Sequence, residues 1–287
     1  MLKIENMTTR FRKKTILHDI TCNFEPGIHG LLGPNGAGKT TFMRTTIGLY
    51  PSAIRHVVLN GTSIRSADIG YLPQKFGLFP GMTVRECMRY IALSKELSSE
   101  NLESDIEAII DNVNLTNYID TKASALSGGM IRRVGIAQAF LGRPALIMCD
   151  EPTSGLDPEE RLRFRNLIKQ IKCNNQVIII STHIVDDVDF LCDYIEIMNH
   201  GRIIAQNTTE NIKSAALGKV YETEDTNLSN LDPNSYFITS QYNNNGKNMT
   251  RLLSYDVADI PKLVPIEPTL EDGYMYLLKF NKNGAHL

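Results

Sequence analysis

A phosphate-binding pattern, G-x-x-x-x-G-K-S/T, is matched at every position by Gly33-Pro34-Asn35-Gly36-Ala37-Gly38-Lys39-Thr40. Glycines let backbone N–H groups turn inward around an anion, and a helix that begins directly after them adds its partial positive charge. Lys39 would reach the β- and γ-phosphates, and the Thr40 hydroxyl would ligate Mg²⁺. A tight glycine turn without a ligand would need neither group. This phosphate loop therefore predicts a nucleoside triphosphate site formed by residues 33–40 and Thr41.

Two carboxylates, Asp150 and Glu151, follow the apolar run Leu146-Ile147-Met148-Cys149. A strand there would direct Asp150 toward the metal beside Thr40, so Asp150 would hold Mg²⁺ directly or through water. Glu151 would orient and deprotonate the attacking water as a general base. A strand end with two solvated acids is the simpler alternative. An acid pair downstream of a phosphate loop favours phosphoryl transfer, and kinases, GTPases and ATPases all stay open at this point.

Between these motifs lies a serine with two glycines, in Leu126-Ser127-Gly128-Gly129-Met130. At a helix start, these residues offer exposed N–H groups to an anion. Taken alone, the pentapeptide is most simply a serine that caps a helix, preceded by a flexible segment of chain. Because the pentapeptide lies between the phosphate loop and the acidic strand, however, the sequence resembles the ATP-binding-cassette (ABC) ATPases. The resemblance implies that the nucleotide is ATP, and that Ser127, Gly128 and Gly129 close over the ATP of a second subunit.

The resemblance covers about residues 1–215 and includes the other family elements in order. It implies that Gln74 senses Mg²⁺ and water and faces the transporter partner, and that the loop Ser154–Asp157 joins two active sites across a dimer. His183 matches the switch histidine that contacts the γ-phosphate. Phe11 occupies the aromatic position that stacks on adenine, although an aromatic residue near a first strand is often part of the core. The implied catalytic residues are Lys39, Gln74, Glu151 and His183, and the implied metal ligands are Thr40, Gln74 and Asp150.

One residue departs from the family, and the tail indicates a branch of it. Met130 stands where the family most often has Gln, but Ser127 and the glycine N–H groups carry the main anion contacts, so we expect an active site. The segment Pro268–Tyr274 is similar to the P-S/T-L-E-D-x-F/Y end of subunits that serve drug, antibiotic and peptide export. A capped helix that packs on its own domain explains this tail equally well.

The elements that must position these residues predict an α/β fold. Strands are expected at Ile28–Leu32, Ala145–Cys149 and Val177–Ser181, and helices at Thr40–Arg44, Ser127–Leu141 and Pro158–Ile171. Helical periodicity fills Thr83–Ile119. The resemblance implies a P-loop NTPase ABC cassette, a RecA-like core with an antiparallel β subdomain and a helical subdomain, over residues 1–215 with the helical part at about 76–140. Residues 216–287 predict a small α+β accessory domain, with strands at Tyr236–Gln241 and Met249–Tyr255 and a helix at Pro268–Phe280.

Composition limits the partners and the location. The net charge of -2 argues against a broad nucleic-acid surface, and the five cysteines are scattered without a C-x-x-C pair, as in a reduced cytosolic protein. The N-terminus lacks the apolar stretch of a signal peptide, and the apolar runs are too short to span a bilayer. We therefore expect a cytoplasmic protein that reaches the inner face of the membrane through a separate permease chain.

The resemblance implies an ATP-hydrolysing transporter subunit that pairs head to tail with a second copy or a related ATPase. Motion would pass to the permease through the segment Gln74–Arg85 and the following helical insert. Phe76, Phe79 and Met82 would form a groove for a short helix of that partner, or they pack locally. A soluble cassette ATPase that acts as a switch or an immunity or regulatory component is the alternative function.

Overall fold

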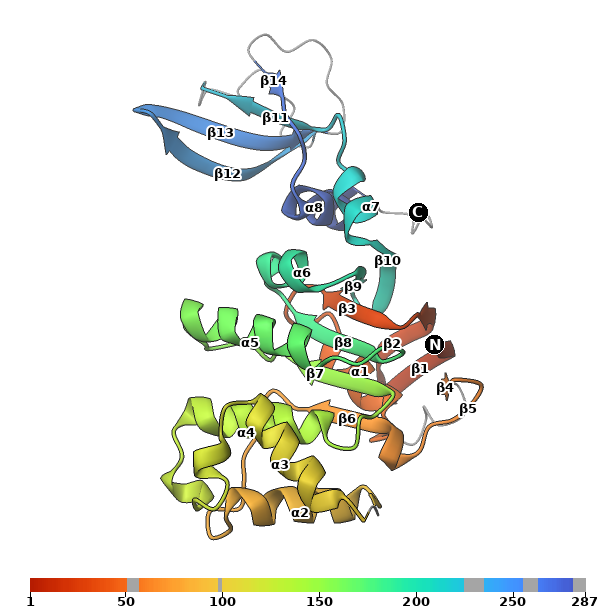
Figure 1. Cartoon of the computed structure of the whole chain (residues 1–287). Helices are drawn as coiled ribbons and strands as arrows, with labels where there is room; N and C mark the ends of the chain where they lie inside the picture. The colour runs from red at the N-terminus through yellow and green to blue at the C-terminus, as the bar shows by residue number, and fades with distance from the viewer. Residues whose placement is uncertain (51–56, 98–99, 225–234, 255–262, 281–287) are drawn as a thin grey trace. The chain divides into compact units, whose positions relative to one another are not determined.

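Figure 1 shows the computed structural model, which describes residues 1–50, 57–97, 100–224, 235–254 and 263–280. Two compact units divide the chain, Met1–Asp193 with Met198–Ile203 and Tyr194–Ile197 with Ile204–Leu287. The domain boundary that the sequence suggests near residue 215 stays a prediction. No helix in the described ranges is long and apolar enough to cross a membrane.

The strands of the first unit form two sheets. They are β1 (Leu2–Phe11), β2 (Lys14–Phe24), β3 (Gly27–Leu32), β4 (Val57–Leu59), β5 (Thr62–Ser63), β6 (Ile69–Leu72), β7 (Leu146–Asp150) and β8 (Val177–Thr182). An antiparallel sheet has the order β2-β1-β4-β5, and a parallel sheet contains the order β3-β8-β7-β6. Two further strands, β9 (Tyr194–Asn199) and β10 (Arg202–Thr208), each have residues in both units.

The parallel strands bring their carboxyl ends to one edge of the sheet. Every residue of β7 and β8 is buried, as expected for apolar strands that are covered on both faces. Leu32 pairs with Thr182, and Asp150 pairs with Ser181. The loops that follow β3, β7 and β8 therefore leave the sheet at the same edge, where ligands bind in open α/β sheets.

Three helices of the first unit, α2, α4 and α5, begin after a residue whose side chain caps them. They are α1 (Lys39–Thr46), α2 (Val84–Ser94), α3 (Leu102–Asn112), α4 (Gly128–Phe140), α5 (Pro158–Ile171) and α6 (Val185–Leu191). Thr83 and Glu86 form a capping box at α2, Ser127 caps α4, and Asp157 caps α5 ahead of Pro158. Figure 1 shows α2, α3 and α4 grouped together, with α4 next to β6; the bounds of the helical part, about residues 76–140, stay a prediction.

In its described residues, the second unit contains a four-stranded antiparallel sheet and two helices. Its elements are α7 (Thr209–Ser214), β11 (Val220–Thr223), β12 (Tyr236–Asn244), β13 (Lys247–Ser254), β14 (Val264–Pro265) and α8 (Leu270–Phe280), and the sheet has the order β12-β13-β11-β14. The hairpin strands are longer than expected at the turn, because Asn245 and Gly246 both adopt positive φ and close it in two residues. The predicted strand end at Tyr255 lies outside the described residues.

The tail motif builds the packing of α8. The Asp272 carboxylate accepts hydrogen bonds from the backbone N–H of Thr269 at 2.7 Å and from its hydroxyl at 2.8 Å, and it pairs with Arg251. At Gly273 a Cβ atom would lie 2.0 Å from the carbonyl oxygen of Ile212 in α7. The glycine therefore lets α8 approach α7 closely, and the motif acts here as a capped helix start within its own unit.

Candidate active site

The phosphate loop connects β3 to α1 in a conformation that requires glycine. Gly36 and Gly38 have φ angles of 81° and 109°, which L-residues with a side chain rarely adopt. At Gly33 a Cβ atom would lie 2.2 Å from the carbonyl oxygen of Met198. The strand, loop and helix that the sequence predicts around this motif are confirmed.

Lys39 holds its ammonium group inside the phosphate loop. The side-chain nitrogen donates to the carbonyl oxygens of Gly33 at 2.6 Å and Pro34 at 3.1 Å. Burial lowers the pKa of Lys39, and the nearby carboxylates of Glu151 and Asp150 oppose that shift. The Lys39 ammonium group is thus held by two backbone carbonyls of the phosphate loop.

Thr40 and Asp150 meet where the sequence predicts a metal. The Thr40 hydroxyl donates to Asp150 Oδ1 at 3.1 Å, and the Ser181 hydroxyl donates to the same oxygen at 2.7 Å. Asp150 is fully buried, and its Oδ2 has no hydrogen-bond partner among the described residues. A hydroxyl and a carboxylate with a free buried acceptor are the oxygen donors that Mg²⁺ prefers, so these residues fit that ion.

Glu151 turns the chain out of β7 in a left-handed conformation. Its φ is 44°, and its backbone N–H donates to the Ser181 hydroxyl at 2.9 Å and the Ser181 carbonyl at 3.1 Å. The side-chain amide of Gln74 donates to Glu151 Oε2 at 2.8 Å, and His183 Nδ1 lies 3.7 Å from Oε1. The structure therefore brings the predicted residues Gln74 and His183 to the carboxylate of Glu151. Backbone strain of this kind clusters at active sites.

A cavity of about 280 Å³ joins the phosphate loop to Glu151. Its walls are Ile16, Asn35, Gly36, Gly38, Lys39, Thr40, Thr41 and Glu151. Sequence reasoning missed Ile16, because nothing local marks one apolar residue of β2 as part of a site. Phe11 does not line this cavity; its ring is 40% exposed and packs edge-on against Tyr50, with ring centroids 4.8 Å apart.

The predicted second anion site, Ser127–Gly129, is not brought to this cavity. Ser127 and Gly128 are exposed, and the Ser127 hydroxyl accepts the backbone N–H of Met130 at 3.3 Å as the cap of α4. None of Ser127, Gly128 and Gly129 lines the phosphate-loop cavity in the part of the chain that the structure describes. We call these three residues the signature turn.

A buried carboxylate that the sequence did not single out braces the loops beside Glu151. Asp187 in α6 accepts from the hydroxyl of Thr153, and from Arg165 in α5 at 2.9 Å. Thr153 follows the acid pair, and Asp187 follows His183 by four positions. The contact thus joins the loop after β7 to the helix after the histidine. The strand-helix spacing alone gave no signal for it.

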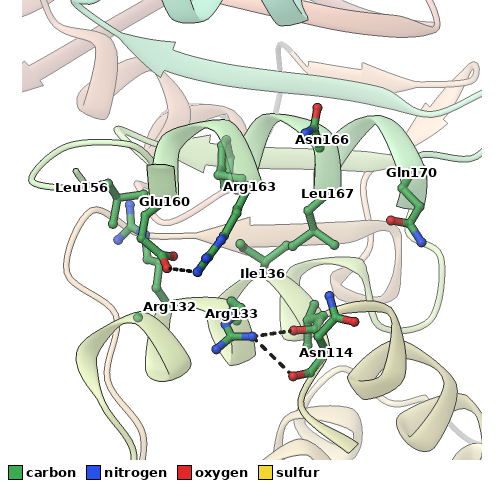
Figure 2. Close-up of a pocket in the computed structure, with 13 residues that line it drawn as sticks. Asn114, Arg132, Arg133, Ile136, Leu156, Glu160, Arg163, Asn166, Leu167 and Gln170 are labelled. Atoms are coloured by element: carbon green, nitrogen blue, oxygen red, sulfur yellow. Dashed lines mark hydrogen bonds and ion pairs between the residues drawn. The ribbon is translucent and has the colours of Figure 1, made fainter. Parts of the chain in front are cut away.

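A second cavity, of about 230 Å³, lies between α4 and α5 (Figure 2). Ile136 and Leu167 line it from the two helices, and Arg132, Arg133 and Arg163 contribute guanidinium groups. In Figure 2 the side chain of Arg133 points toward Asn114, whereas Arg132 extends toward the segment that holds Leu156. The two neighbouring arginines therefore serve different parts of the structure.

Two exposed aromatic rings on the helical part contact each other. Phe79 and Tyr90 are 52% and 53% exposed, and their centroids are 5.2 Å apart in an edge-to-face contact. Phe76, in contrast, packs against α4, where a Cβ atom at Gly135 would lie 2.8 Å from its ring. Of the two aromatic residues proposed for a partner groove, one is therefore used locally and one is available.

Comparisons with known proteins give one family. A family model described as ABC transporter matches residues 17–154. The chain is 33% identical over 221 residues to the linearmycin resistance ATP-binding protein LnrL of Bacillus subtilis, which covers 75% of this chain and 71% of that protein. It is 31% identical over 225 residues to the Nod factor export ATP-binding protein I of Cupriavidus pinatubonensis, over 76% of this chain and 69% of that one. A solved structure of an ATP binding subunit of an ABC transporter matches with a TM-score of 0.64 and 26% identity, over 74% of this chain and 91% of that one.

Proposed function

The chain belongs to the ABC transporter family as an ATP-binding ATPase subunit, and we propose that it drives export of a drug, antibiotic or peptide through a separate permease chain. Two copies, or this chain and a related one, close head to tail around two ATP molecules. The subunit then lies in the cytoplasm against the inner face of the membrane. Relatives named for linearmycin resistance and Nod factor export support export as the direction of transport.

The exposed signature turn is the observation that carries the dimer. Ser127 and Gly128 are exposed, and neither lines the cavity formed by the phosphate loop of the same chain. A helix start binds anions through its N–H groups and its dipole, so we infer that the ligand of this turn comes from a second chain. The terminal phosphate of an ATP held by a second chain supplies that charge.

The residues of the first unit divide the chemistry among them. The phosphate loop and Lys39 neutralise the triphosphate, and Thr40 with Asp150 would hold Mg²⁺, which supplies charge compensation on the phosphates. Glu151 takes the proton of the attacking water, while Gln74 and His183 orient that water and the γ-phosphate. Phe11 stacks on adenine. Hydrolysis removes the γ-phosphate that favours the closed dimer, and the two chains separate.

The substitution Glu151→Gln tests the base and the dimer together. It should abolish ATP turnover but keep ATP binding, since the amide cannot accept the proton of the water yet has nearly the same shape. Size-exclusion chromatography with ATP should then show accumulated dimers. Glu159→Gln is the control, because Glu159 is an exposed acid that pairs with Arg163 on α5. Retained hydrolysis would mean that Glu151 is not the base.

The permease contact is tested at the two exposed aromatic rings. We expect Phe79→Ser combined with Tyr90→Ser to prevent recovery of a multi-span membrane chain when the tagged full chain is captured from solubilised native membranes. ATP-dependent dimers of the Glu151→Gln variant should persist in that background. The control is Tyr118→Ser, since Tyr118 is also 45% exposed on the helical part. Undiminished recovery with the double variant argues against this surface.

A further inference from the structure

Arg132 connects three backbone carbonyl groups around the candidate active site. Its Nε donates to the carbonyl of Pro152 at 3.0 Å, one terminal nitrogen to that of Glu151 at 2.9 Å, and the other to that of Gln74 at 3.1 Å. The residues it holds are therefore the general base, its successor and the glutamine that touches the base. Charged donors make the stronger class of hydrogen bond.

The helix that carries Arg132 packs at its C-terminal end against the strand that leads to Gln74. At Gly70 a Cβ atom would lie 1.8 Å from the carbonyl oxygen of Ala139, so β6 and α4 approach at backbone distance. One residue earlier in α4, the buried Gln138 donates to the carbonyl of Tyr71 at 2.6 Å. Arg132 makes a further contact with this region from the N-terminal part of α4.

The same end of α4 is the signature turn. Gly129 and Arg132 are three residues apart, which places them on neighbouring positions of one helix face. A displacement of the turn therefore moves the Arg132 backbone with it, because the two positions lie within one turn of the same helix. The turn points outward from its own chain, whereas the guanidinium faces the acid loop of that chain.

We propose that Arg132 is a positioning residue that couples the two ATP sites of the dimer. The proposal rests on the head-to-tail dimer of the preceding section. When the signature turn closes over the partner's ATP, Arg132 carries that movement to the backbone of Gln74 and Glu151 in its own site. The two sites then become competent together, and hydrolysis depends cooperatively on ATP.

Only arginine fits this task at this position. Its planar group presents donors on three nitrogen atoms in fixed directions, so it can hold three separate carbonyls, whereas a lysine ammonium is a single point. The neighbouring Arg133 donates to the carbonyls of Val113 and Asn114 instead and ties α4 to the end of α3 (Figure 2). Arg133 therefore attaches α4 to the helical part, whereas Arg132 attaches α4 to the candidate active site.

The test is the ATP dependence of hydrolysis by the purified full chain with Arg132→Met, Arg132→Lys and Arg163→Met. We expect a Hill coefficient above 1 for the wild type, with two sites setting an upper limit of about 2. Arg132→Met should lower it to about 1 and reduce kcat by about 10- to 100-fold, as a misplaced catalytic group does. The affinity for a fluorescent ATP analogue should change less than about twofold, because Arg132 does not line the phosphate-loop cavity.

The other two variants guard against a general packing effect. Arg132→Lys keeps the charge but reaches fewer carbonyls, so its kcat and Hill coefficient should lie between those of Arg132→Met and the wild type. If Arg132→Met does not fold, the Hill coefficient and kcat of Arg132→Lys test the proposal instead. Arg163→Met should behave as the wild type, since Arg163 lines the same second cavity but pairs with Glu159 and Glu160 of its own helix.

Failure of the inference is distinguishable from failure of the dimer. An unchanged Hill coefficient in Arg132→Met, or a coefficient of 1 in the wild type, overturns the coupling role while Glu151→Gln still forms ATP-dependent dimers. Absence of those dimers overturns the proposed function, and the coupling role with it.

Discussion

The carboxylate of Glu151 is directed by the backbone rather than by a favourable local preference. Its φ of 44° costs on the order of 1 kcal/mol or more, and the neighbouring strand compensates because Ser181 accepts its N–H twice. The same serine donates to Asp150. One residue of β8 thereby contacts both members of the acid pair.

Lys95, at the end of α2, makes the stability of the chain depend on alkaline pH. Burial lowers its pKa to about 8, and its ammonium group donates to the carbonyl of Gln138 at 2.8 Å. An unfolded lysine titrates near 10.4, so between pH 8 and 10 the unfolded chain binds more protons and stability rises with pH. Below pH 8 both states are charged, and the full cost of burying the charge is present.

Replacing Lys95 by Met should therefore raise the free energy of unfolding at pH 7 by about 1 to 3 kcal/mol, the lower values reflecting loss of the hydrogen bond. The gain should shrink as the pH approaches 10, where the lysine is neutral in the folded state. Urea unfolding at both pH values measures it, and Lys122→Met, at an exposed lysine, is the control. An equal gain at pH 7 and pH 10 would contradict a titration effect.

At the scale of elements, the parts that local sequence determines were predicted well. The expected helix Pro158–Ile171 is α5 with the same bounds, because Asp157 and Pro158 mark its start and its apolar period marks its length. The expected cap Ser127 begins α4. The helical periodicity in Thr83–Ile119 corresponds to α2 and α3, in which Val84, Cys87 and Met88, and then Ile106 and Ile110, are buried.

The contacts between elements were not predictable, because they depend on strand register and helix docking. Ser181 reaches both acids only because it pairs with Asp150 across β7 and β8. Arg132 reaches Gln74 only because glycine lets α4 touch β6. Motif spacing therefore selected the residues for chemistry, and the fold supplied the residues that hold them in place. The roles of the site residues themselves stay predictions until the variants above are measured.

At the scale of the whole chain, each unit has its own buried apolar cluster. In the first unit it includes Leu31, Phe42, Met148 and Ile179, which lie beneath the phosphate loop and the acid pair. In the second unit Ala216, Val220 and Leu253 form a smaller one. All lining residues of the phosphate-loop cavity belong to the first unit. Separate clusters lead us to expect that the second unit can be destabilised without loss of ATP hydrolysis.

Asp272→Ala tests this expectation, because it leaves the Arg251 guanidinium buried without its main partner. Asp272 is 1% exposed, and removing one member of a buried pair costs about 3 to 5 kcal/mol. Hydrogen exchange should accelerate in β12 and β13 but not in β7 and β8, with an ATPase rate within about twofold of the wild type. Lys247→Ala is the control, since its ion pair with Glu224 is exposed and contributes at most about 1 kcal/mol. Equal acceleration in β7 and β8 would show that the two units unfold as one, and the phosphate-loop site would then depend on the tail that Asp272 anchors.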